Sequence, residues 1–546
     1  MKRFLVSLLT LSLCLSIAAC SSGQVPSAPP TSSSGAAASS SAQPAAPLNV
    51  WAIESPSVTD YASNAQSLWM EEQTGISVNW KPVPSTGWYS AFQASVMGGE
   101  DVDIYLYPFD TMETEMLGID MQYIVPLDSL ITPENTPNIC AILDSNPGLK
   151  QLITASDGHI YTLFANDVYA VDAYKQKMWV NRHFLEAYTA ATGHGMPETT
   201  AQFEEMLVYF NTHDMNGDGV QNEIPYIGVS GVDGMYNLFG SFLPANSNAG
   251  FGCFRDEQGE FVFSYTQEAY REALAYVRDL YKQGLISPDT FTTNASERYA
   301  LTSGRRDTVR AGVVVAVTAD QVVQLSSEAD SMTYDDYVAL PPLEGPDGVR
   351  TIVTTGESTV SLRNAITIHC DDPVAAIRWL DAGYSETARL YSVYGGLENE
   401  DWGYVQGETI SGPGQTITSL LQSADNVCWS GQGIAHRVTE ADFQRMDASQ
   451  IAYNSDLATY RANLAYRPYA LLNEWPPIVW PSAYQEEASQ YSELNGLISK
   501  AVTEYYTAAI TGSKDLAGDW DSYVTTLNDI GLERFVELVA LYCSAG

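Results

Sequence analysis

The chain of 546 residues is strongly acidic, with 66 Asp and Glu against 26 Lys and Arg and a formal net charge of -40. A surface this negative repels nucleic acid and anionic lipid, so both are excluded as partners. The hydrophobic content of 45% is enough for packed cores, and the length predicts two or more domains or lobes.

The N-terminus has the three-part pattern of a secretory leader. Lys2 and Arg3 precede the apolar run 4–17, which is shorter than the roughly 20 residues that a membrane span needs. The leader ends in Ala18-Ala19-Cys20, which resembles the lipobox of bacterial lipoproteins. We therefore predict a signal peptide at 1–19 and lipidation of Cys20 with palmitate-type chains. The alternative is an ordinary signal peptide in which the cysteine is incidental.

The segment 20–47 is dominated by Ser, Ala, Pro, Gly and Thr. Such a composition buries too little apolar surface to offset its conformational entropy, which predicts a disordered tether. A lipidated cysteine with a tether predicts a protein anchored to the outer face of the cell membrane without spanning it. The length of the tether favours a Gram-positive envelope.

Strand and helix patterns alternate at the start of the body. Strands are predicted at 48–53, 76–80 and 102–107, with helices at 61–73 and 88–97 between them. The β-α-β-α-β order indicates a largely parallel sheet with helices on its faces. Ligands of such sheets bind beyond the carboxyl ends of the strands.

Helical patterns dominate later parts of the chain. Apolar residues recur at helical spacing over 270–281, and Gly284 follows as a stop. The stretch 486–541 is predicted to be mostly helical, with breaks near Gly512 and Gly518. Five cysteines lie scattered through the body without C-x-x-C pairing, so no disulfide framework is predicted.

The sharpest chemical motif is the run 214–223, Asp-Met-Asn-Gly-Asp-Gly-Val-Gln-Asn-Glu. Oxygen-bearing side chains at alternate positions, with Gly219 for the sharp turn, match the first half of a calcium loop. The twelfth position is Pro225 instead of the usual glutamate, and a strand pattern follows at 224–229. We predict a structural calcium ion outside a helix-loop-helix. The alternative is a turn rich in Asn, Asp and Gly that binds nothing.

Several segments together resemble the family 1 extracellular solute-binding proteins, in particular the large lipoproteins that bind oligosaccharides, including the alginate-binding branch. The matching segments span nearly the whole body, and they are 196–207 running into 214–225, Trp179-Val180-Asn181-Arg182, 340–348, Tyr394-Gly395-Gly396-Leu397-Glu398, and 510–532. A departure follows the helix that ends near Tyr394, where this chain carries an insertion through Trp402.

The resemblance implies an α/β fold of the periplasmic-binding-protein type II class. Each of its two lobes would have a mainly parallel sheet flanked by helices, followed by a helical C-terminal region. We assign 48–167 plus 336–385 to lobe 1 and 168–335 plus 386–546 to lobe 2. Closure of the lobes on a trapped ligand would create a shape that the permease subunits of an ABC importer recognise. We also predict a monomer.

The resemblance further implies which oxygens hold the calcium ion. The ligand set maps to Asp214, Asn216, Asp218, the carbonyl of Val220, Asn222 and Glu223.

Sugar sites need flat apolar faces for the ring and carboxylates or amides for the hydroxyls. Candidate ligand residues lie where a strand or a glycine-rich segment enters a loop, and they are Glu54, Tyr107, Asp110, Asn166, Asp167, Tyr236 and Trp402. For each aromatic residue, simple packing in the core is the alternative.

Catalytic motifs are absent from the sequence. There is no H-E-x-x-H, G-x-S-x-G, P-loop or G-x-G-x-x-G pattern, and acidic pairs without a barrel pattern carry little signal for a glycosidase. The prediction is a lipid-anchored binding protein that delivers a carbohydrate to an ABC importer and is not an enzyme. The alternatives are a surface adhesin or sensor with the same cleft, a peptide binder, or a glycan-active enzyme.

Overall fold

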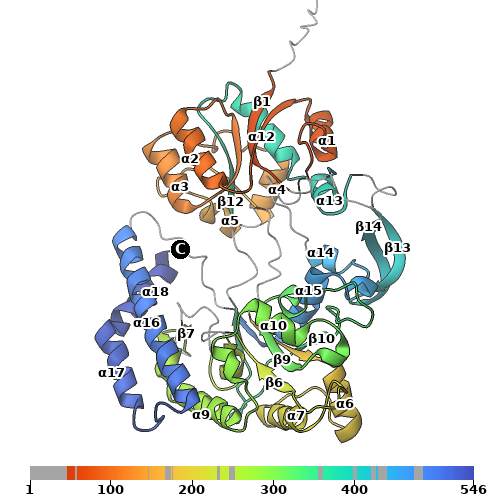
Figure 1. Ribbon diagram of the computed structural model, residues 1–546. Coiled ribbons are helices and arrows are strands. Elements are labelled where there is room, and N and C mark those ends of the chain that lie inside the picture. The colour runs from red at the N-terminus through yellow and green to blue at the C-terminus, as the bar shows by residue number, and fades with distance from the viewer. Residues whose placement is uncertain are drawn as a thin grey trace, which may run out of the picture. The chain divides into compact units, whose positions relative to one another are not determined.

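The structure is a computed structural model (Figure 1). It describes residues 46–545 except 56–57, 146, 166–173, 175, 230–233, 245–251, 257, 355–360, 397–401, 420–425, 428, 430–439 and 473–483. The predicted leader, the predicted lipidation site Cys20 and nearly all of the predicted tether lie outside the described residues. So do the candidate ligand residues Asn166 and Asp167.

The first sheet has the strand order β2-β1-β3-β12-β4. Its strands are β1 (Leu48–Ile53), β2 (Val78–Val83), β3 (Ile104–Phe109), β4 (Leu163–Phe164) and β12 (Leu362–Ile366). β1 pairs in parallel with β2 and β3, as the alternating sequence pattern predicted. β12 runs antiparallel to β3 and β4, so the sheet is mixed at that end.

Helices cover both faces of this sheet because its strands are apolar on both sides. Val50 and Ala52 point to one core cluster, whereas Trp51 and Ile53 point to another. The helices of this part are α1 (Ala65–Thr74), α2 (Trp88–Gly98), α3 (Thr111–Glu115), α4 (Pro137–Ser145), α5 (Pro147–Leu152), α12 (Pro373–Ala382) and α13 (Glu386–Tyr394). α1, α4 and α12 contribute to the first cluster and α2 to the second, which gives the layered arrangement expected of an α/β fold.

The second sheet has the order β10-β5-β9-β6. Its strands are β5 (Lys177–Asn181), β6 (Ile224–Ile227), β9 (Ala311–Ala316) and β10 (Tyr337–Leu340). Only β6 and β9 are parallel, because β5 runs antiparallel to both of its neighbours. The connection from β5 to β6 carries two helices instead of one, so β6 returns in the opposite direction. The expectation of a mainly parallel sheet therefore needs correction here: this sheet is mixed.

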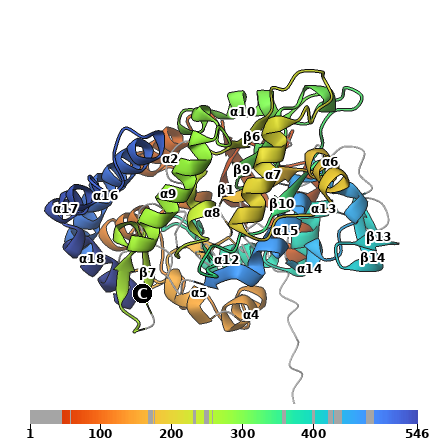
Figure 2. The same ribbon diagram turned by 90° about the horizontal axis from the view of Figure 1, so that it is seen from below.

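Two core clusters again lie on opposite faces of the second sheet. Met178 and Val180 belong to one of them, and Trp179 and Val314 belong to the other. The helices of this part are α6 (Arg182–Thr192), α7 (Thr200–Thr212), α8 (Tyr236–Phe239), α9 (Glu268–Lys282), α10 (Ala295–Thr302), α11 (Ala319–Val322), α14 (Glu440–Phe443) and α15 (Ser455–Tyr466). α7 and α9 share one core, and Figure 2 shows them running across the same face.

The C-terminal region is helical, as predicted. It consists of α16 (Gln485–Thr511), α17 (Trp520–Ile530) and α18 (Leu532–Ala545). α16 ends at Gly512, which has a left-handed backbone with φ 84°. Their apolar faces join the core that contains α9. Burial of a continuous apolar surface thus attaches these helices to the second sheet.

Short elements complete the described chain. They are the strand pairs β7 (Cys253–Arg255) with β8 (Phe261–Phe263), β11 (Ile352–Thr354) with β15 (Ala470–Leu472) and β13 (Trp402–Thr409) with β14 (Gly412–Ser419). There are also the π-helix η1 (Met116–Asp120) and the 3-10 helices η3 (Ser264–Thr266), η4 (Pro288–Phe291), η5 (Arg306–Thr308), η6 (Ala448–Gln450) and η7 (Arg467–Tyr469). A search of the described helices for one long and apolar enough to cross a bilayer finds none.

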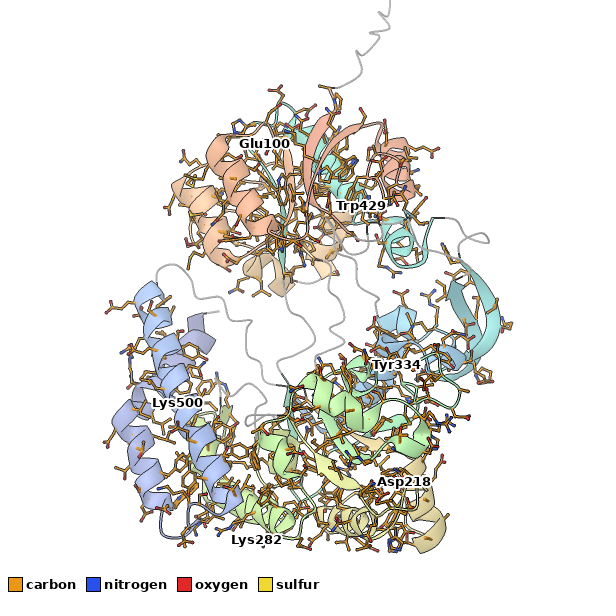
Figure 3. All side chains as sticks on the ribbon, in the orientation of Figure 1. Glu100, Asp218, Lys282, Tyr334, Trp429 and Lys500 are labelled. Carbon is orange, nitrogen blue, oxygen red and sulfur yellow. The ribbon has the colours of Figure 1, made fainter. Side chains whose placement is uncertain are left out.

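The predicted lobe ranges need two corrections. β10 lies inside the range assigned to lobe 1 but pairs with β5 in the second sheet. Conversely, Tyr391 and Trp429 lie in the range assigned to lobe 2, and both pack against the first sheet's helices, with Tyr391 at 5.4 Å from Trp69. Side chains of α1 and α12 contact Trp429, which Figure 3 labels, and these contacts hold it in the first core. The remaining boundaries stay predictions.

Candidate ligand-binding edge and calcium loop

The carboxyl ends of β1, β2 and β3 meet at one edge of the first sheet. Glu54 follows β1 directly, its side chain is exposed, and its backbone N–H donates to the Val83 carbonyl at 2.8 Å. Asp110 follows β3 and is also exposed. The fold therefore brings two of the predicted carboxylates to the edge where ligands of parallel sheets bind.

Asp110 has a structural task in addition to its position. Its carboxylate accepts the Glu113 N–H at 2.6 Å, and Glu113 Oε2 accepts the Asp110 N–H at 3.3 Å, which makes a capping box for α3. Burial raises the pKa of the Glu113 carboxyl. The Asp110 carboxylate is thus fixed in orientation at the edge while it remains accessible to solvent.

Tyr107 lies in the core and offers no face to a ligand. Its ring is 2% exposed and stacks on Phe92 with centroids 3.8 Å apart, and its hydroxyl donates to Glu113 Oε1 at 3.0 Å. Burial, and then the charge of Glu113, raise the pKa of this hydroxyl. The packing alternative therefore holds for Tyr107, and its contribution is to support the edge from behind.

Two aromatic residues at the same edge were missed by the sequence analysis. Trp88 and Tyr89 begin α2 after the turn that follows β2, and Tyr89 is 47% exposed. The half-buried Trp88 ring lies 5.4 Å from Tyr107 and 5.9 Å from Tyr89. The strand predicted at 76–80 extends to Val83, so only the short segment 84–87 separates it from α2. The Pro84–Gly87 turn was the signal that could have located it.

A pocket of about 650 Å³ opens beside Glu54. Glu54, Ser55 and residues 58–62 form one wall, and residues of β2, including Trp80 and Pro82, form the other. The Trp80 ring stacks on Tyr61 with centroids 4.9 Å apart and planes inclined by 29°. A flat aromatic wall with carboxylates at the rim is suited to binding a sugar ring.

The two candidates from the second sheet's surroundings are buried. Tyr236 is 1% exposed within the core that contains α9, and Trp402 is 6% exposed in the core on the opposite face. Their aromatic area is already covered by protein, so the packing alternative holds for both. No candidate ligand residue outside the first sheet is therefore placed at a surface by the described part of the chain.

The predicted calcium loop lies between α7 and β6, where Figure 3 labels Asp218. Asp214 accepts the N–H groups of Gly217 and Gly219, each at 2.8 Å. Both glycines have positive φ, 78° and 85°, which the tight turn requires. The described segment thus has the wrapped backbone of a cation loop, and β6 in place of an exit helix, as predicted.

The other side chains of the predicted ligand set make hydrogen bonds within this loop. Glu223 accepts the Met215 N–H at 2.6 Å and the Asn222 N–H at 3.0 Å, and Asn222 Nδ2 donates to Asp218 Oδ2 at 3.3 Å. Asn216 Oδ1 accepts the Asp218 N–H at 2.9 Å.

Asn222 Oδ1 supplies the test of whether the loop fits a cation. It is buried and has no hydrogen-bond partner among the described residues. An unpaired oxygen inside an all-oxygen loop fits a hard cation such as Ca²⁺. Among the described residues, no group of three or more His, Cys, Asp or Glu converges as a metal site. The carboxylates of Asp214, Asp218 and Glu223 accept backbone N–H groups of the loop instead.

No family model matches the chain. The fructooligosaccharide ABC transporter substrate-binding protein FusA of Streptococcus pneumoniae is 23% identical over 496 residues, which cover 87% of this chain and 85% of FusA. Over most of its length this chain is therefore similar to an ABC transporter substrate-binding protein. Lipoprotein LipO of Bacillus subtilis is 30% identical over 175 residues, 30% of this chain and 32% of LipO.

Solved structures show the same fold. A FusA EF-hand mutant in complex with fructo-nystose matches with a TM-score of 0.64 at 20% identity, covering 92% of this chain and 99% of that one. A solute-binding protein from Bifidobacterium longum infantis, described as binding HMO and associated with an ABC transporter, matches with a TM-score of 0.67 at 18% identity, covering 91% and 98%. The two-lobed α/β fold predicted from the sequence is confirmed, and the names of these relatives describe them as substrate-binding or solute-binding proteins.

Proposed function

We propose that this protein is the extracellular receptor of an ABC importer and that it captures an oligosaccharide without transforming it. The main observation behind this proposal is the edge of the first sheet. At the carboxyl ends of its strands lie Glu54, Asp110, Trp88 and Tyr89. FusA, which carries fructooligosaccharide in its name, shares the fold over nearly the whole chain.

The side chains divide the work of sugar recognition. The carboxylates of Glu54 and Asp110 accept hydrogen bonds from hydroxyl groups, and the faces of Trp88 and Tyr89 cover the C–H side of a ring. Tyr107 and Glu113 hold this platform rigid through their 3.0 Å hydrogen bond. A rigid platform reduces the entropy lost on binding. The capture of the ligand between the two lobes belongs to the same proposal.

The location outside the cell is part of the proposal. Cys20, acylated after removal of residues 1–19, would anchor the body through the 20–47 tether, so that it meets its ligand and the permease at the membrane surface. The partial relative LipO, named a lipoprotein, supports this reading.

A structural calcium ion completes the proposal. Asp214, Asn216, Asp218, the Val220 carbonyl, Asn222 and Glu223 would hold it, and Asn222 Oδ1 gives the unpaired oxygen that favours a cation. The FusA structure described as an EF-hand mutant supports a loop of this kind in a relative. The ion would supply no chemistry to the ligand, because its loop would only fix the connection between α7 and β6.

The test uses the full chain in detergent, a glycan array, and native mass spectrometry of the bound species. We expect an oligosaccharide to be retained with unchanged mass, and the Glu54→Gln variant to bind it at least tenfold more weakly. Glu328→Gln, a carboxylate of a different pocket, is the matched control and should bind like the parent chain. Release of a cleaved sugar, or retention of peptides only, would contradict the proposal. Binding restricted to immobilised polymers would favour the adhesin alternative.

A further inference from the structure

The pocket beside Glu54 carries an inference about the kind of sugar. Its volume of about 650 Å³ lies within the roughly 300–1,000 Å³ range of small-molecule sites. It begins at the carboxyl end of β1 and continues along β2, the outer strand of the sheet. An oligosaccharide lying on the proposed edge would therefore reach the pocket with one of its rings.

The aromatic wall of this pocket is held rigidly. Trp80 is half-buried, and its ring is braced by Tyr61 and by Trp429, whose centroid lies 5.3 Å away (Figure 3 labels Trp429). The Tyr61 hydroxyl donates to the Ile53 carbonyl at 2.8 Å, and burial raises its pKa to about 12, so this hydroxyl stays neutral. The wall is thus a fixed, uncharged flat surface.

The charged side chains of the pocket are all negative. Glu54 and Asp60 are exposed at its rim, and none of the described residues that line it is a lysine, arginine or histidine. Lys81, the cation of β2, makes an ion pair with Glu100 at 3.4 Å and donates to the Asp101 carbonyl. A ligand here meets hydrogen-bond acceptors and a negative potential, which favour hydroxyl groups and repel carboxylates.

We infer that this pocket binds one ring of a neutral oligosaccharide and that it excludes anionic sugars such as uronates. The inference rests on the proposed function and narrows it to one chemical class of ligand. Trp80 covers the apolar face of the ring, and the carboxylates of Asp60 and Glu54 accept hydrogen bonds from its hydroxyl groups.

The test has two stages, both with the full chain in detergent. An array of neutral oligosaccharides and mannuronate oligomers is screened first. The tightest neutral binder is then titrated by calorimetry into the parent chain and into Asp60→Asn and Trp80→Leu. We expect neutral glycans alone to bind, with affinity lowered about fivefold by Asp60→Asn and at least tenfold by Trp80→Leu. Glu328→Gln and Tyr299→Leu, made in the separate pocket of about 840 Å³, are the matched controls and should leave affinity unchanged.

The outcomes separate this inference from the proposed function. The inference would be overturned if Asp60→Asn and Trp80→Leu bound the neutral glycan as tightly as the parent chain does. It would also be overturned if mannuronate oligomers bound as tightly as neutral glycans. Either result would leave the proposed function as an importer receptor unaffected. Binding to no glycan would overturn the proposed function itself. Because Trp80 packs against the core, thermal unfolding of Trp80→Leu is measured alongside, and the surface substitution Asp60→Asn decides the question if that variant does not fold.

Discussion

At the scale of single residues, environment decides the role of chemically identical side chains. Tyr107 and Tyr89 lie near each other, yet the first is 2% exposed and packed, and the second is 47% exposed at the sheet edge. Carboxylates divide in the same way. Glu54 faces solvent, whereas Asp336 is 5% exposed and has an entirely structural set of partners.

Asp336 yields a prediction about acid stability. Burial opposes its charge, but His183 at 2.7 Å, the Thr333 N–H at 2.7 Å and Arg306 at 3.2 Å lower its pKa from 3.8 to about 2. Because the folded pKa lies below the ordinary value, the stabilisation is fully present above about pH 4 and is lost as the pH falls through about 2. Asp336→Asn should lower the unfolding free energy at pH 7 by about 2 kcal/mol.

Urea denaturation of both proteins at several pH values measures this difference, which should shrink as the pH is lowered from 4 towards 2. Asp307→Asn is the control, because Asp307 is an exposed carboxylate that pairs with Arg305. A pH-independent difference would show that Asp336 acts through packing and not through its charge.

At the scale of elements, the local sequence pattern predicted whether a segment is a helix or a strand better than it predicted where a strand ends or in which direction it runs. The strand at 48–53 and the helix that begins at 88 appear as predicted, because alternating and helical apolar periods need no tertiary information. β2 begins two residues later and ends three residues later than predicted. Lys81 and Pro82 interrupt the apolar strand pattern, although an edge strand tolerates both residues. The antiparallel direction of β5 was invisible, since it depends on which strands become its neighbours.

Helix α16 offers a matched pair of glycine substitutions. Gly496 lies on an exposed face inside the helix with open space around its Cα, so Gly496→Ala should raise the unfolding free energy by about 0.5–1 kcal/mol. Gly512 ends the helix at φ 84°, so Gly512→Ala should lower it by about 1 kcal/mol or more. Chemical denaturation of the two variants measures both changes, and equal signs would contradict this account of the helix end.

The 214–223 loop gives a prediction about ion removal. With free calcium at 100 times its Kd, a bound ion would add about 2.7 kcal/mol to the unfolding free energy. A chelator should therefore lower the melting temperature of the parent chain, and added calcium should restore it. Asp214→Asn should abolish that response. Asp256→Asn, in the β7–β8 turn where Asp256 accepts N–H groups of Gln258 and Glu260, should preserve it. A melting temperature that the chelator does not change would show that the loop is a turn that binds no ion.

At the scale of the whole molecule, the charge imbalance acts on stability. A net charge of -40 repels itself in the compact state, and salt weakens that repulsion. Raising NaCl from 10 to 150 mM shortens the screening length from about 30 to about 8 Å. We expect the melting temperature, measured by calorimetry at fixed calcium concentration, to rise over this range. A fall would mean that the surface ion pairs outweigh the general repulsion.

The sequence by itself determined the α/β class, the acidic surface, the position of the 214–223 loop and the helical C-terminal region. Each of these depends on composition or on contacts between residues near each other in the chain. Only the tertiary structure decided that Trp88, Tyr89, Glu54 and Asp110 share one edge while Tyr107, Tyr236 and Trp402 are core. It also placed Trp429 in the first core and the Tyr391 ring against Trp69 of α1. The physical reason is that burial is set by whichever distant segments complete the packing around a side chain, and a local pattern carries no record of them.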